Sequence, residues 1–134
     1  EDMDLSWRAR LRGWRCLYSP RAIATHIGSA SQSGRIRTLH KAPHVQRHIW
    51  KNRYLILTKN APVEVLIVLF PWLLLGECFH WLIIFLCRPY RLPIFFLAHF
   101  DYLRLLRSVL KKRRLVQNGR QIGLREVLNI FERF

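Results

Sequence analysis

An apolar stretch in the middle of the chain, Val65 to Cys87, constrains the fold more than any other feature. It spans 23 residues, and a helix needs about 20 apolar residues to cross the hydrocarbon core of a bilayer. Its strongly polar residues are Glu77 and His80, and a carboxylate inside the bilayer costs about 3 kcal/mol. Pro71 and Gly76 favour a kink or a break in the helix. The stretch is long enough to span a membrane, but these residues argue against a simple span.

Basic residues surround this apolar centre. Of 134 residues, 23 are Lys or Arg and 8 are Asp or Glu, so the net charge is +15. No acidic residue occurs between Asp4 and Glu64, or between Asp101 and Glu126. The charge excludes an ordinary neutral soluble enzyme, and a hydrophobic content of 51% excludes a disordered basic tail. Two basic blocks around an apolar centre favour anionic membrane lipids, and not nucleic acid, as the partner.

The positions of the two basic blocks also bear on how the chain meets a membrane. Lys and Arg are preferentially kept on the cytoplasmic side, so a single crossing would place one block on the disfavoured side. A membrane-embedded hairpin, or two helices lying in the interface, keeps both blocks at the cytoplasmic face of the cell membrane. We favour this arrangement, and a true span remains the alternative.

Periodicity and turn residues divide the chain into three segments. Residues 1–60 form the first segment, which carries the candidate site residues, 61–117 a hydrophobic and amphipathic membrane-associated helical hairpin, and 118–134 a short C-terminal helix. The pattern predicts a mostly α-helical chain with two short strands. The expected helices cover 2–12, 43–59, 92–115 and 123–133, and the expected strands cover 16–18 and 22–25.

The second arm of the predicted hairpin is amphipathic. Arg104, Arg107, Lys111 and Arg114 share a narrow helical face, and leucines occupy the broad opposite side. This pattern is typical of a helix that lies among lipid headgroups. A core helix with a solvated charged face has the same pattern, and the neighbouring apolar stretch favours the membrane.

An acidic cluster, Glu1-Asp2-Met3-Asp4, begins the chain in an otherwise basic half. Acidic residues stabilise a helix N-terminus, which explains the cluster without any function. Alternatively, one carboxylate is a general base kept ionised by nearby cations. The abrupt start without Met suggests a chain cut from a longer protein at this point.

Further candidates for binding follow the acidic cluster. His26 comes after the second expected strand, where a side chain can reach a divalent ion carried by a diphosphate, although a lone histidine is more often structural. Arg35, Lys51 and Arg53 can bind phosphates, or they can form a solvated face. Three scattered cysteines indicate reduced thiols and not a disulfide framework.

The order of these residues closely resembles the C-terminal half of family-two glycosyltransferases, in their rhamnosyltransferase-like, non-processive branch. The resemblance covers essentially the whole chain, and its specific part is the first 60 residues. It rests on Glu1-Asp2-x-Asp4, Gly13-Trp14, His26-x-Gly28-Ser29, Lys51-Asn52-Arg53-Tyr54, Lys59-Asn60-Ala61-Pro62 and Lys112-Arg113-Arg114-Leu115. Gln46-Arg47-His48-Ile49-Trp50 has Ile where processive synthases carry Arg, which disfavours a processive polymerase.

The resemblance implies a parent protein with an α/β, Rossmann-like GT-A fold and an inverting mechanism. Asp2 would deprotonate the acceptor hydroxyl, and Glu1 would support it. A divalent cation, Mg or Mn, would neutralise the leaving nucleoside diphosphate, with His26 as a further contact. The family's nucleotide-binding half and Asp-x-Asp motif would precede Glu1, so we expect the 134-residue chain alone to be inactive.

We therefore expect part of a membrane-associated glycosyltransferase of cell-surface polysaccharide synthesis. It would move a sugar, such as rhamnose or another hexose, from a nucleotide-sugar donor to a glycan or lipid-linked acceptor. The alternative is a small basic membrane-anchored protein that binds anionic lipid or nucleic acid.

Overall fold

The computed structural model describes residues 2–23 and 41–132 of the chain. The described residues are mostly helical, as the periodicity predicted. The elements are α1 (Asp2–Leu11), α2 (Pro43–Asn60), α3 (Val63–Cys87), a single 3-10 turn η2 (Pro89–Arg91), α4 (Leu92–Asn118) and α5 (Leu124–Glu132).

The helix boundaries follow from residues that cannot continue a helix or that favour its start. Gly13 has φ +76, a left-handed conformation that only glycine adopts readily, and it lies just beyond α1. Pro43 occupies the first turn of α2, where no backbone donor is lost. Pro62 precedes α3, and Pro89 begins the turn between α3 and α4.

Two local expectations are corrected. No strand forms at 16–18 or at 22–23, and residues 24–25 lie outside the described part. Cys16-Leu17-Tyr18 has a β-like composition, but a strand needs a neighbour to accept its backbone hydrogen bonds, and no described segment provides one. The expected break at Pro71 or Gly76 does not occur, because α3 is one continuous helix through both residues.

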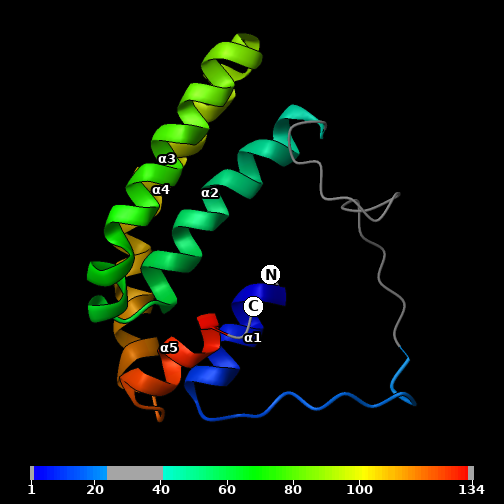
Figure 1. The fold of residues 1–134 in the computed structure, drawn as a ribbon, viewed down its shortest axis with the longest axis vertical. Helices are drawn as coiled ribbons and strands as arrows, with labels where there is room; N and C mark the ends of the chain where they lie inside the picture. The colour runs from blue at the N-terminus through cyan, green and yellow to red at the C-terminus, as the bar shows by residue number, and fades with distance from the viewer. Residues whose placement is uncertain (1, 24–40, 133–134) are drawn as a thin grey trace.

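Helices α2, α3 and α4 form the body of the molecule (Figure 1). Trp81 of α3 contacts Phe95 near the start of α4, and Leu69 packs in the same cluster as Val116 near its end, so the two helices are antiparallel. Helix α2 runs parallel to α4. The successive pairs along these two helices are Trp50 with Phe95, Tyr54 with His99 and Thr58 with Tyr102.

Two small cores hold this arrangement together. One lies among α2, α3 and α4 and contains Trp50, Ile84, Phe95 and Ala98. The other joins α1, α3 and α5 through Leu11, Val65 and Val127, at the end of the bundle where Figure 1 places α1 and α5.

Helix α3 leaves most of its apolar surface uncovered. It is the one described helix long and apolar enough to cross a membrane, and only 6% of its most apolar window is buried. In its C-terminal half, Glu77, Trp81 and Ile84 share one face and point inward, and Val65 near its start packs in the second core. A helix that is apolar all round is normally covered by protein or by lipid, and here the rest of the described protein covers one side only.

Candidate functional site

The first polar cluster joins α1 to the end of α2 through the carboxylate of Asp4. Lys59 Nζ lies 2.7 Å from this carboxylate, and Asn60 Nδ2 donates to it at 2.8 Å. Arg8 Nε donates to it at 3.1 Å from within α1. Asp4 thus collects three donors from two helices that are separated by a long stretch of sequence.

The charges around Asp4 keep it ionised. Burial of the side chain acts to raise its pKa, but the hydrogen bonds from Lys59 and Asn60, together with the positive charges of Lys59 and Arg8, outweigh burial. The pKa of Asp4 therefore lies below its ordinary value. At neutral pH the carboxylate neutralises part of the positive charge that gathers at this end of the bundle.

Helix α4 closes the same end of α2. Arg113 Nη1 donates to the backbone oxygens of Thr58 and Ala61, both at 2.6 Å, and Gln117 Nε2 donates to that of Asn60 at 2.9 Å. These bonds satisfy carbonyls at the helix C-terminus, where the helix itself offers no donor. As a result, α1, α2 and α4 are held at fixed positions beside one another.

A cavity of about 430 Å³ opens beside the Asp4 cluster, and we call it the α1–α4 pocket. Its lining combines cations with apolar side chains. The cations are Arg8, Arg12, Lys59 and Lys112, and the apolar residues include Leu5, Trp14, Leu115 and Val116.

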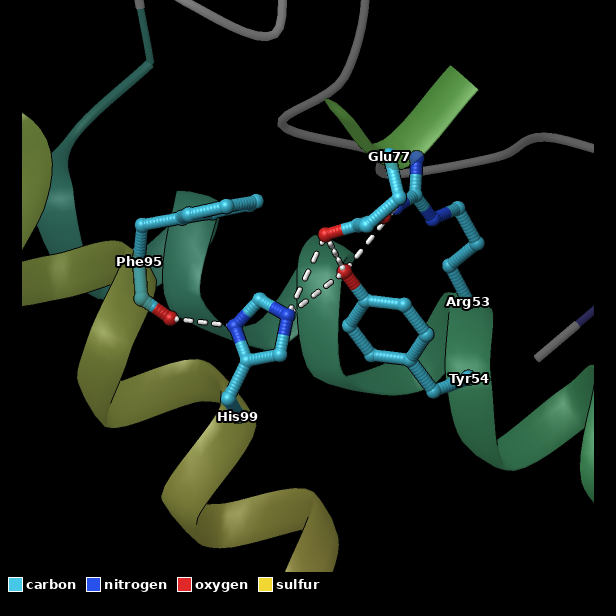
Figure 2. A network of polar contacts seen from close by, with 5 residues as sticks. All are labelled: Arg53, Tyr54, Glu77, Phe95 and His99. Atoms are coloured by element: carbon cyan, nitrogen blue, oxygen red, sulfur yellow. Dashed lines mark hydrogen bonds and ion pairs between the residues drawn. The ribbon is translucent and has the colours of Figure 1, made fainter. Parts of the chain in front are cut away.

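The second polar cluster lies midway along the bundle. Figure 2 shows Glu77 of α3 directed toward Arg53 and Tyr54 of α2 and His99 of α4. Arg53 and Glu77 form an ion pair, and Tyr54 Oη donates to Glu77 Oε1 at 2.5 Å. His99 Nε2 lies 3.0 Å from Tyr54 Oη and 3.2 Å from Glu77 Oε1, and His99 Nδ1 lies 2.8 Å from the Phe95 carbonyl oxygen.

This network explains how an apolar helix carries a carboxylate. Glu77 points away from the uncovered face of α3 and has its partners within the bundle, so its own charge does not face outward. Burial, together with the hydrogen bond to Glu77, raises the pKa of Tyr54 above its ordinary value. The phenol therefore stays a hydrogen-bond donor at neutral pH.

Three of the six residues predicted to act on a nucleotide sugar lie in the described part of the chain: Asp2, Lys51 and Arg53. Asp2 is exposed at the start of α1 and has no hydrogen-bond partner among the described residues. Lys51 Nζ lies 3.1 Å from His48 Nδ1, and the Arg53 side chain is engaged with Glu77 and Tyr54. The remaining candidates lie outside the described residues: Glu1, His26 and Arg35.

The described part of the chain contains no cluster of side chains that could bind a divalent cation. Residues 2–23 and 41–132 contain no group of three or more His, Cys, Asp or Glu side chains arranged to hold a metal ion. His26 lies outside these ranges, so its contact with Mg or Mn stays a prediction.

Sequence reasoning placed Asp4 in the acidic cluster at the start of the chain, and local spacing explains only its contact with Arg8, four residues further on. Its contacts with Lys59 and Asn60 join residues more than 50 positions apart, and no local pattern predicts such contacts. The single carboxylate in an apolar stretch was a signal that Glu77 needs a partner, but the sequence did not show that Arg53, Tyr54 and His99 would provide one.

Comparisons of the chain with protein-family models, with curated proteins and with solved structures found no match.

Proposed function

We propose that this chain is part of a membrane-associated inverting glycosyltransferase, in which Asp2 is the general base. The observation that carries the proposal is the contact of Asp4 with Lys59 and Asn60. Two of the segments on which the resemblance rests, at the start of the chain and at residues 59–62, meet through this contact. Their proximity supports the proposal.

The positions of Asp2 and Asp4 on α1 support different roles for the two carboxylates. They are two residues apart, so their side chains leave the helix on different sides. Asp4 is held by Lys59, Asn60 and Arg8, whereas Asp2 is exposed and unpaired among the described residues. Asp4 would fix α1 in place, and Asp2 would remain free to accept a proton from an acceptor hydroxyl.

The uncovered apolar surface of α3 supports docking on a membrane. Exposed side chains such as Leu75, Phe79 and Leu82 lie on the side of α3 away from Glu77, and lipid is the environment in which such a surface is stable. The basic residues of α4 would meet anionic headgroups at the cytoplasmic face. Donor sugars are cytoplasmic metabolites in this proposal, and the acceptor would be a glycan or a lipid-linked molecule at that face.

A small basic membrane-anchored binding protein is the second candidate. The same uncovered surface of α3 favours it, because membrane docking requires no transferase activity. Its ligands would be anionic lipids or nucleic acid. The two candidates differ in whether Asp2 matters for any chemical step.

Sugar transfer by the intact gene product, measured with a panel of nucleotide sugars, tests the proposal. Removal of a general base lowers turnover by about 10²–10⁴-fold, so Asp2→Asn should lose turnover and keep nucleotide binding. Glu126→Gln, which changes an exposed carboxylate on α5, is the matched control and should keep both. Full turnover by Asp2→Asn would reject Asp2 as the base, and membrane binding without any transfer would favour the second candidate.

A further inference from the structure

The α1–α4 pocket has a charge that its own surroundings do not neutralise. Four cations line it, contributed by α1 and its C-terminal extension, α2 and α4. Asp4 pairs with two of them, Arg8 and Lys59. The side chains of Arg12 and Lys112 make no hydrogen bond or ion pair with any described residue. The pocket therefore presents guanidinium and ammonium donors that are available to an anion.

The same pocket also has an apolar wall, which a simple anion does not need. Trp14 is 69% exposed and Leu115 is 73% exposed, although both are large apolar side chains. They line the pocket together with Leu5 and Val116. A ligand that covers both halves must carry a negative group and a hydrophobic part. The volume, about 430 Å³, is in the range of small-molecule sites.

The location of the pocket agrees with a ligand that comes from a membrane. Val116, which lines the pocket, packs in the same cluster as Val65 and Leu69 at the beginning of α3. The uncovered surface of α3 begins at this level, with Val63 and Ile67. The pocket and the first exposed apolar residues of α3 therefore lie at the same end of the bundle.

We propose that the α1–α4 pocket binds a phosphorylated lipid, a phosphate monoester or diphosphate that carries a hydrocarbon chain. Arg12 and Lys112 bind the phosphate oxygens, and Trp14 and Leu115 contact the chain. The inference goes beyond the proposed transferase, because binding requires neither a donor sugar nor Asp2. It also names one defined site for an anionic lipid, where the sequence alone indicated only that the basic blocks attract such lipids.

Photochemical labelling in non-ionic maltoside micelles tests the site. The probe is dodecyl phosphate with a diazirine on its chain, and labelled residues of the full chain are mapped by mass spectrometry. We expect label on Trp14 or Leu115.

Loss of one charged hydrogen-bond donor weakens binding about tenfold, so Arg12→Ala and Lys112→Ala should each reduce labelling to that degree. Lys111→Ala removes the same charge one residue away, outside the pocket, and should stay within about twofold of the wild type.

Competition separates a lipid from a free phosphate. Unlabelled dodecyl phosphate should displace the probe at far lower concentration than inorganic pyrophosphate. The Leu115→Asn substitution should weaken competition by dodecyl phosphate and leave competition by pyrophosphate unchanged. Equal competition by pyrophosphate would overturn the lipid assignment. Equal losses for Lys111→Ala and Lys112→Ala, with unchanged helix content by circular dichroism, would show a diffuse basic surface and overturn the site. No nucleotide sugar is present, so failure of the transferase proposal leaves this result unaffected.

Discussion

The carboxylate of Asp4 holds α1 against the rest of the molecule, and its protonation should control that contact. Its side chain is only 16% exposed, and it accepts hydrogen bonds from Lys59, Asn60 and Arg8. Because these donors lower the pKa of Asp4 in the folded chain, folding is favoured when the carboxylate is ionised. This stability is present above the ordinary pKa of about 3.9 and is lost as the pH falls through the lower folded value.

Asp4→Asn should therefore lower the free energy of unfolding at pH 7 by about 1–3 kcal/mol, the usual cost of losing hydrogen bonds to a charged group. The difference from the wild type should begin to shrink below about pH 4, where Asp4 of the unfolded chain becomes protonated, and disappear below the lower pKa of the folded chain. Denaturant titrations at both pH values measure it. Asp101→Asn is the control: it breaks an ion pair with the more exposed Arg47 and should cost less than about 1 kcal/mol. A loss that is the same at both pH values would contradict the role of charge.

The helices could be predicted from the sequence much better than their contacts. Hydrophobic spacing, Pro43 and Gly13 are local signals, and they located the helices closely. Cys16-Leu17-Tyr18 misled the prediction, because strand formation depends on a partner segment and not on composition alone. The partners of Glu77 and Asp4 come from other helices, so no spacing rule identified them. Only the i to i+4 pair of Asp4 with Arg8 was predictable.

Helix α3 exposes more apolar surface than any other described helix, and such a surface is unfavourable in water. Beyond Glu64 in its first turn, its outward side chains are mostly apolar, and the carboxylate of Glu77 is paired with residues of α2 and α4. In a membrane interface both facts are favourable, since lipid covers the apolar side and the bundle covers Glu77. The free energy of membrane binding should then depend on outward residues of α3 and not on exposed apolar residues elsewhere.

Leu75→Lys and Phe79→Lys test this dependence. Both side chains are 61% exposed on α3, and a lysine in place of an apolar residue in lipid costs up to about 3 kcal/mol. Each substitution should weaken binding to phosphatidylcholine–phosphatidylglycerol vesicles by at least about tenfold in co-sedimentation. Met3→Lys, an equally exposed apolar position on α1, should not weaken it. If all three variants bound alike, α3 would not be the membrane-facing element.

The whole bundle limits how α3 can enter a bilayer. Helix α4 is apolar only over its first third, after which Asp101, Arg104 and Arg107 follow, so it is too short in apolar length to cross the hydrocarbon core. Helix α3 is tied to α4 and α2 through the core around Ile84 and the network around Glu77. A perpendicular crossing by α3 would pull these polar partners into lipid at a cost of several kcal/mol. The bundle should instead lie along the surface, with the uncovered side of α3 in the interface.

The three cysteines allow this orientation to be tested without engineered labels. Cys16 lies beyond α1, Cys78 and Cys87 lie on α3, and all three are exposed. With α3 along the cytoplasmic surface, a membrane-impermeant maleimide should label Cys16 and Cys87 in inverted vesicles and neither in right-side-out vesicles. Cys78, near the centre of the lipid-facing helix, should react slowly until detergent is added. Labelling of Cys87 from the outer face alone would mean that α3 crosses the bilayer, because Cys87 ends that helix and Cys16 would then remain on the opposite side.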